Sequence, residues 1–307
     1  IDAGAGDDTI AFASNVSLSD SLNGGDGNDT LTATIDDGSA AQRIGTLTGV
    51  ENATYSFDQT AGSLDATGSV TTITTLNVEA DDTLHIINLS SDQTVKITEP
   101  SAIDYATTTL DYANDATANV EFGSAHDTGN VVITDAQTVN FTNKTADTTL
   151  GTVVLDATAD SSGAGGTDTV NITAGSSGGG FITGTFAAAE AETITLTTSD
   201  TNAHISIANI ISVQDLNTLT ITAGGGGDTA NDSDISTGTV GASNAGDEVE
   251  TISVTAADGA DVTLGALTLT GSSSTSYTFD ANTTGSIITV GAIANTTGSL
   301  TQLTASA

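Results

Sequence analysis

The chain has 307 residues, with 39 Asp and Glu against 3 Lys and Arg, so its formal net charge is −36. This charge argues against nucleic acid as a partner, because affinity for phosphates depends on Lys and Arg that release counterions, and against adsorption to anionic lipid. No stretch approaches the roughly 20 apolar residues of a membrane span. Cysteine is absent, which rules out thiol nucleophiles and fits a secreted protein.

Threonine is the most informative residue type in the composition. There are 59 threonines, whereas Trp, Met and Cys are absent and Phe and Tyr together supply 11 positions. Threonine favours the pleated surface of a strand because its β-branch restricts χ1 in helices. With so few aromatic residues, a thick core is not expected. The composition therefore predicts an extended all-β protein.

Two glycine-rich motifs open the chain, AGAGDDTIA at residues 3–11 and GGDGNDTLT at residues 24–32. Both fit the nonapeptide G-G-x-G-x-D-x-U-x, in which U is a large apolar residue. The second motif matches every fixed position, and the first has Ala3 in place of the first glycine. The motifs lie 21 residues apart, three more than two nine-residue turns, so the spacing allows them to recur on one side of a coil. The matching residues are Gly4, Gly6, Asp8 and Ile10 in the first motif and Gly24, Gly25, Gly27, Asp29 and Leu31 in the second.

These residues resemble the calcium-binding repeats of RTX proteins, which bacteria secrete through type I systems and which include toxins, proteases, adhesins and surface-layer proteins. The resemblance covers residues 3–32 of the chain. It implies a parallel β-roll in which the glycine-rich half of each repeat turns around Ca²⁺ and the remaining residues form a short strand. It also implies secretion to the bacterial cell surface, and a surface-layer protein is the most similar type.

Calcium coordination explains why glycine and acid occur together in these motifs. Ca²⁺ takes six to eight oxygen ligands at loosely specified geometry, and glycine permits the backbone angles that point carbonyls inward. Asp8 and Asp29 are the expected carboxylate ligands, with carbonyls of Gly4, Gly6, Gly25 and Gly27 beside them. We expect Asp7, Asp26 and Asn28 to be supporting or peripheral. The alternative is an ordinary Asx and glycine turn without an ion.

Three regions follow from the pattern along the chain. Residues 1–44 carry the RTX-like repeats, and residues 45–150 are an irregular β region that is either an insertion or a separate subdomain. Residues 151–307 are predicted to form solenoid coils of about 25 residues. A partial motif within this last region, Gly163 to Val170, makes Asp168 a further candidate calcium ligand.

A longer repeat supports the solenoid. The pattern Thr-apolar-x-apolar recurs, and its last four copies begin 24, 25 and 33 residues apart. Second alternating segments, HISI at 204–207 and DVTLGALTLTG at 261–271, follow two of the copies. Because strands this short cannot bury a face alone, stacking coils is the natural way to make a core. An antiparallel sandwich is the alternative, particularly for residues 45–150. The copies are TLNVEA (75–80), TVNITA (169–174), TITLTT (193–198), TLTITA (218–223) and TISVTA (251–256).

No catalytic constellation is expected. His85, His126 and His204 are far apart in sequence, and none occurs at zinc-ligand spacing. The paired acids Asp36-Asp37, Asp81-Asp82 and Asp247-Glu248 could serve glycoside cleavage, but solvated corners or calcium sites are the preferred interpretation. The sequence thus predicts a protein that is not an enzyme.

The predicted function is structural. We expect an extracellular subunit of a surface layer or matrix that self-associates through calcium, with Ca²⁺ as its only cofactor and copies of itself as partner. Because Ile1 lies inside a repeat, residue 1 is expected to be a cut through a longer protein, whose other regions could bind a cell-surface glycan. Two alternatives are the stalk of an RTX adhesin and the calcium-binding carrier module of a secreted enzyme.

Overall fold

The structure is a computed structural model of the chain. Its described residues form short β-strands that stack on one another from the N-terminal to the C-terminal end. It describes residues 1–12, 17, 20–35, 41–42, 45–57, 61–67, 70–77, 83–91, 93–98, 106–123, 126–143, 147–155, 167–175, 179–188, 191–200, 202–213, 216–224, 234–242, 251–269, 274–283, 285–295 and 299–306.

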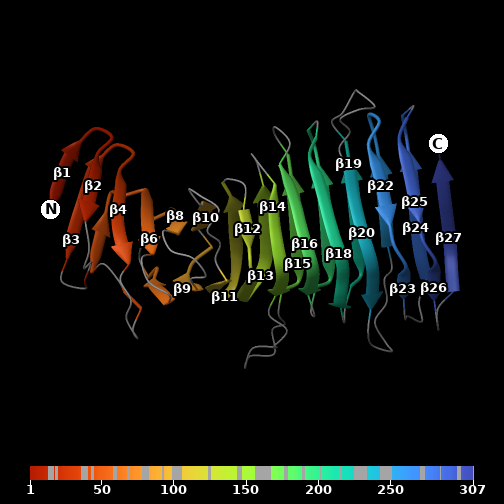
Figure 1. Ribbon diagram of the computed structural model, residues 1–307, viewed down its shortest axis with the longest axis horizontal. Helices are drawn as coiled ribbons and strands as arrows, with labels where there is room; N and C mark the ends of the chain where they lie inside the picture. Colours follow the sequence, from red (N-terminus) through yellow and green to blue (C-terminus); the bar gives the residue numbers. More distant parts are fainter. Residues whose placement is uncertain are drawn as a thin grey trace.

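The strands form a parallel β-solenoid whose coils succeed one another along the long axis, with the two termini at opposite ends (Figure 1). Two columns of strands, which we call the first face and the second face, run along it. The first face contains β2 (Thr9–Phe12), β4 (Thr30–Ile35), β6 (Asn52–Phe57), β8 (Thr72–Asn77), β10 (Thr94–Thr98), the later parts of β11 (Thr107–Phe122) and β13 (Asn130–Asn143), β15 (Thr169–Ala174), β17 (Thr193–Thr198), β19 (Thr218–Ala223), β21 (Thr251–Ala256), β24 (Ser274–Ala281) and β27 (Ser299–Ser306).

The second face is built from the strands that alternate with these along the chain. It contains β7 (Ala61–Asp65), β9 (Thr83–Leu89), the earlier parts of β11 and β13, β12 (His126–Thr128), β14 (Thr148–Leu155), β16 (Gly180–Ala188), β18 (His204–Val213), β20 (Asp234–Ala242), β22 (Asp261–Leu264), β23 (Leu267–Leu269), β25 (Ile287–Val290) and β26 (Ile293–Asn295). A three-stranded sheet at the N-terminal end contains β1 (Asp2–Ala5), β3 (Ser21–Asp26) and β5 (Thr46–Thr48).

The predicted fold class, an all-β parallel solenoid, is confirmed. Every described ladder is parallel, including those of β6, β8, β10, β11 and β13 within residues 45–150. The antiparallel sandwich considered for that segment is therefore not what its described strands form. The first-face ladder passes from β4 through these strands into β15, so this segment shares the stacking of its neighbours.

The four later copies of the threonine repeat coincide with β15, β17, β19 and β21. Their first threonines are direct register partners, Thr169 with Thr193, Thr193 with Thr218 and Thr218 with Thr251. Each strand buries every second residue, because successive side chains of a strand point to opposite sides. The first copy was predicted three residues too late. β8 begins at Thr72, which pairs with Thr94, so the repeat there is TITTLN and not TLNVEA.

The core is a continuous column of mostly small aliphatic side chains with one aromatic cluster. Phe141 of β13 is 1% exposed, and its ring centroid lies 6.2 Å from that of Phe122, 5.6 Å from Phe181 and 6.4 Å from Phe186. These rings come from both faces, since Phe181 and Phe186 belong to β16. The cluster therefore ties the two faces together near the middle of the chain.

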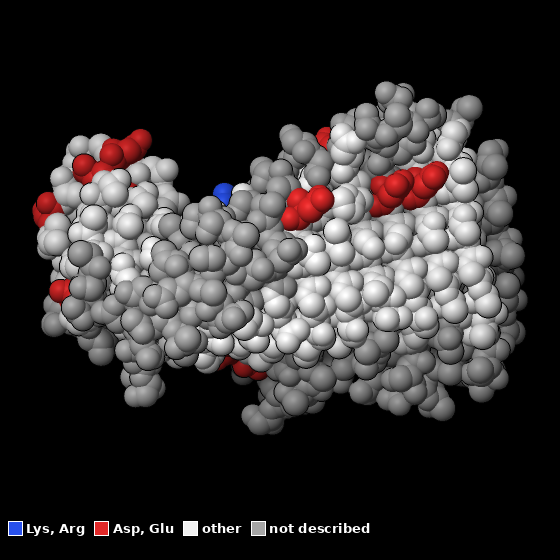
Figure 2. Space-filling model, in the orientation of Figure 1, with Lys and Arg blue, Asp and Glu red and all other residues white. Residues whose placement is uncertain are grey.

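In the view of Figure 2, acidic side chains gather at the N-terminal end of the molecule and in a row near the upper edge of its C-terminal half, and the described surface just below that row is uncharged. Of the three basic residues, only Lys96 lies among the described residues, and its Nζ is 3.3 Å from Oε1 of Glu121. The described residues include no helix long and apolar enough to cross a membrane.

Candidate metal centre

The two glycine motifs stack directly on one another at one corner of the N-terminal coils. Gly4 of β1 pairs with Gly25 of β3, and Thr9 of β2 pairs with Thr30 of β4, so the whole motif repeats after one coil of 21 residues. The backbones approach closely: a Cβ on Gly25 would lie 1.6 Å from the carbonyl oxygen of Gly4, and Gly25 has φ +107°. Only glycine fits such a contact in such a conformation.

Asp29 is the centre of this corner. Its side chain is fully buried, and its Oδ1 accepts a hydrogen bond of 2.8 Å from the backbone N–H of Asp8 in the preceding coil. Its Oδ2 is buried and has no hydrogen-bond partner, and the same is true of Oδ2 of Asp8. Leaving a buried polar atom unpaired costs roughly 1 to 3 kcal/mol, and more for a charged group. The corner therefore carries this cost twice, once in each of two consecutive coils.

A backbone carbonyl points toward the same place as the unpaired oxygen of Asp29. The position that a Cβ would occupy on Gly24 is 1.9 Å from the carbonyl oxygen of Gly49 and 2.4 Å from Oδ2 of Asp29. Because both oxygens lie close to this one point, they lie close to one another. Glycine at position 24 keeps the space between them free of a side chain. Converging carboxylate and carbonyl oxygens are the donors that Ca²⁺ prefers.

The third coil completes the corner with two residues that the motif search did not include, Gly49 and Glu51. Oε2 of Glu51 accepts a hydrogen bond of 2.9 Å from the N–H of Asp29, and the carbonyl of Asp29 accepts from the N–H groups of Glu51 and Asn52 at 3.2 and 3.0 Å. The carboxyl groups of residues 8, 29 and 51 thus occur in consecutive coils. The signal in the sequence was the run Gly-Val-Glu-Asn at 49–52, which follows Gly-Asn-Asp-Thr at 27–30 by 22 residues.

The remaining predicted residues of the two motifs surround this centre. Oδ1 of Asp7 accepts from the N–H of Asn28 at 2.9 Å, and Oδ1 of Asn28 accepts from Nδ2 of Asn52 at 2.7 Å, both on the exposed side. The carbonyl of Asp26 accepts from the N–H of Gly6 at 2.7 Å, and Gly27 stacks on Gly6. These groups hold neighbouring coils together, while their role toward a metal stays a prediction.

Asp168 does not join the N-terminal corner. It lies just before β15, where its carbonyl accepts from the N–H groups of Glu192 and Thr193, both at 2.9 Å. Asp29 accepts in the same way from the next coil, so Asp168 occupies an equivalent place much farther along the solenoid. Its predicted glycine turn, residues 163–166, lies outside the described residues. The assignment of Asp168 as a calcium ligand therefore stays a prediction.

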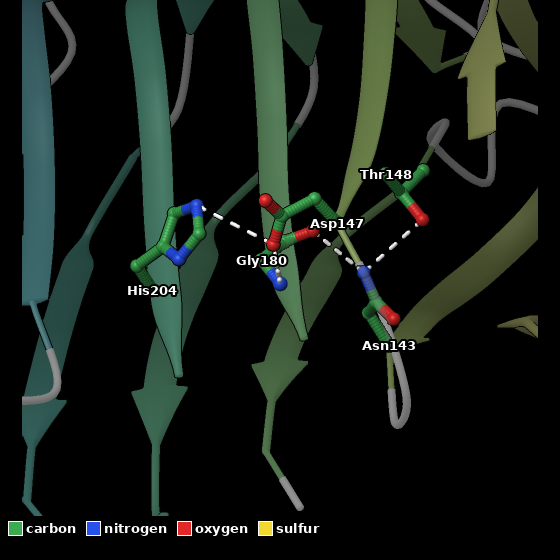
Figure 3. Close-up of polar contacts among 5 residues, drawn as sticks. All are labelled: Asn143, Asp147, Thr148, Gly180 and His204. Atoms are coloured by element: carbon green, nitrogen blue, oxygen red, sulfur yellow. Dashed lines mark hydrogen bonds and ion pairs between the residues drawn. The ribbon is translucent and has the colours of Figure 1, made fainter. Parts of the chain in front are cut away.

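A histidine and an aspartate from different coils meet on the second face (Figure 3). Nε2 of His204 lies 3.9 Å from Oδ1 of Asp147, which also accepts from the N–H of Gly180 at 3.1 Å. The ring crosses over Gly180, where a Cβ would be 2.2 Å from it. The buried Asn143 donates from Nδ2 to Oγ1 of Thr148 at 3.1 Å and to the carbonyl of Gly180 at 2.6 Å. This contact was not predicted, because the residues are distant in sequence.

Among the described residues, few side chains are placed to form another metal site or a catalytic site. These residues contain no group of three or more His, Cys, Asp and Glu side chains that could hold a metal ion, so a metal at the glycine corner would depend on backbone carbonyls as well. His85 is a half-buried residue of β9. The paired acids at 36–37, 81–82 and 247–248 lie outside the described residues.

Comparisons with family models, with curated proteins and with solved structures find no match to this chain.

Proposed function

We propose that this chain is a structural extracellular protein that binds Ca²⁺ at the N-terminal corner and self-associates as a subunit of a surface layer or matrix. The observation that carries the proposal is Oδ2 of Asp29, a buried carboxylate oxygen without a hydrogen-bond partner, beside the carbonyl of Gly49 and over a glycine backbone. A bound cation would satisfy this oxygen and offset the charges of Asp8, Asp29 and Glu51 in adjacent coils.

The affinity expected of such a site suits an exported protein. Extracellular modules bind Ca²⁺ with dissociation constants of roughly 10⁻⁴ to 10⁻³ M, so the corner would stay loose at the low calcium of a cytosol and become rigid after export. Because only the folded corner brings these oxygens together, binding would stabilise the fold by mass action. The net charge of −36 adds self-repulsion that divalent ions would also reduce.

Replacing Asp29 with Asn should lower the number of Ca²⁺ ions bound per chain in titration calorimetry. The variant keeps the acceptor for the N–H of Asp8 but loses the charged, unpaired oxygen. The matched control is Asp2→Asn, because Asp2 is an exposed residue of the same coils and accepts from Nδ2 of Asn23 at 3.1 Å. Equal stoichiometry in the Asp29 variant, the control and the wild type would remove Asp29 from the ligand set.

Chelation should disperse assemblies of the purified chain and loosen its β-fold. We expect sheets or tubes in electron micrographs at millimolar Ca²⁺, single particles in excess chelator, and a reduced β signal in circular dichroism after chelation. Circular dichroism reports on the fold, and electron microscopy reports on the self-association. Assemblies unchanged by excess chelator would contradict calcium-dependent association, and isolated rods at millimolar Ca²⁺ would favour the stalk of an adhesin.

A further inference from the structure

The outward side of the first face carries a regular array of threonines over β15, β17, β19 and β21. These four strands present twelve outward positions, of which ten are threonine, one is serine and one is asparagine. All twelve are half-buried or exposed. We call them the threonine array: Thr169, Asn171, Thr173, Thr193, Thr195, Thr197, Thr218, Thr220, Thr222, Thr251, Ser253 and Thr255.

The array has the order of a two-dimensional lattice. The three ladders that join its strands have no register shift, so outward residues line up in three straight rows, for example Thr173, Thr197, Thr222 and Thr255. Parallel strands are about 4.8 Å apart, and outward residues on one strand are separated by about 6.6 Å. The hydroxyl and methyl groups therefore repeat at two fixed spacings.

Strand propensity alone does not account for this distribution. The second face consists of strands of the same solenoid, yet threonine occupies only four of the described outward positions of β14, β16, β18 and β20, namely Thr149, Thr152, Thr185 and Thr239. The other outward positions there hold Gly, Ala, Ser, Asn, Asp, His, Ile and Val. A general preference for threonine in strands would enrich both faces equally.

The array is also free of charge, in a chain whose net charge is −36. None of its twelve residues is ionisable. Exposed strand positions are where acidic residues would ordinarily keep so acidic a protein soluble. The outward positions of β14, β16, β18 and β20 on the second face include one acidic residue, Asp234, so the absence of charge is shared by both faces and is complete only in the array.

We propose that the threonine array binds the surface of ice. Water molecules on a face of an ice crystal also repeat at two fixed spacings. Each threonine offers a hydroxyl that joins the hydrogen-bonded lattice and a methyl group that favours ordered water beside it. A rigid array meets the lattice without losing side-chain entropy, because the β-branch already restricts χ1.

Two other occupants fit the array less well. The four strands cover on the order of 400 Å², about half of the roughly 800 Å² per partner of a stable protein interface, so a second copy of the chain would also have to contact the outward residues of β13 and β24 on either side of the array. A carbohydrate is usually recognised with aromatic rings, and the array has none.

The test compares two pairs of substitutions in the full chain at millimolar Ca²⁺. The first pair, Thr195→Tyr with Thr220→Tyr, places bulky side chains on register neighbours at the centre of the array. The control pair, Thr185→Tyr with Asn209→Tyr, does the same on register neighbours of the second face. Tyrosine keeps a high strand propensity and adds no charge, so both variants should fold. Equal circular dichroism spectra and midpoints of thermal unfolding check this.

The readouts are the shape of a growing ice crystal, the gap between its freezing and melting points, and the inhibition of recrystallisation. Wild type and control should facet ice and inhibit recrystallisation, and the array variant should lose both effects. A wild type that behaves like an unrelated globular protein at equal concentration would overturn the proposal. So would equal loss in both variants, or an array variant that changes only its state of association in light scattering, which would instead identify a second copy as the occupant.

Discussion

Replacing Phe141 with alanine should lower the free energy of unfolding by about 3 to 5 kcal/mol, the usual cost of deleting a buried aromatic ring. Phe141 is 1% exposed and lies within ring-contact distance of Phe122, Phe181 and Phe186. Most of the other buried side chains of the described core are smaller and aliphatic. Urea unfolding monitored by circular dichroism measures the loss.

The location of the loss is as informative as its size. A solenoid coil contacts only its neighbours, so the defect should be greatest in β11, β13 and β16 and small in β21 and β24. Hydrogen exchange resolves this difference. Phe141→Leu is the matched control, since it retains most of the volume and should cost clearly less. A loss below about 1 kcal/mol for Phe141→Ala would show that the aromatic cluster is not packed as described.

Replacing Gly25 with alanine should separate the first two coils, whereas Gly4→Ala should only strain them. The two glycines have nearly the same backbone angle, φ +107° and +109°, so both substitutions carry a conformational cost of about 1 to 3 kcal/mol. Only at Gly25 does the new Cβ meet another backbone, 1.6 Å from the carbonyl oxygen of Gly4; at Gly4 nothing lies within 4 Å. Overpacking adds a further cost of about 1 to 3 kcal/mol.

Hydrogen exchange at the corner distinguishes the two variants. The N–H of Gly6, bonded to the carbonyl of Asp26, and the N–H of Asp8, bonded to Asp29, should lose protection in Gly25→Ala and largely keep it in Gly4→Ala. The calcium affinity should fall in the same order. Equal effects of the two substitutions would mean that the coils do not stack as closely as the corner requires.

The solenoid was predictable because its strands repeat a simple pattern. In β15, β17, β19 and β21 a threonine begins each strand and large apolar residues alternate with outward polar ones, so the period of two shows the strand and the repeated first residue shows the register. β8 shows the limit of this reasoning. Its segment contains two threonine pairs, Thr71-Thr72 and Thr74-Thr75, and the pairing of Thr94 with Thr72 shows that the repeat begins at Thr72 and not at Thr75.

The candidate site was predictable only in part. Asp8, Asp29 and their glycines follow a fixed spacing, so the stacking of the two motifs could be anticipated. Gly49 and Glu51 escaped the search because the third coil has a shorter corner: four steps separate Thr48 from Asn52, whereas seven separate Asn23 from Thr30. The contact of His204 with Asp147 could not be inferred at all, since loops of variable length intervene.

The central claim is that a cation satisfies the unpaired oxygen of Asp29, and a crystal structure of the chain grown at millimolar Ca²⁺ tests it most directly. The account predicts an ion at about 2.3 to 2.6 Å from Oδ2 of Asp29 and from the carbonyl oxygen of Gly49, the usual Ca²⁺–oxygen distance. A refined structure in which this corner holds no ion, and Oδ2 of Asp29 instead accepts a hydrogen bond from the protein or from water, would contradict it.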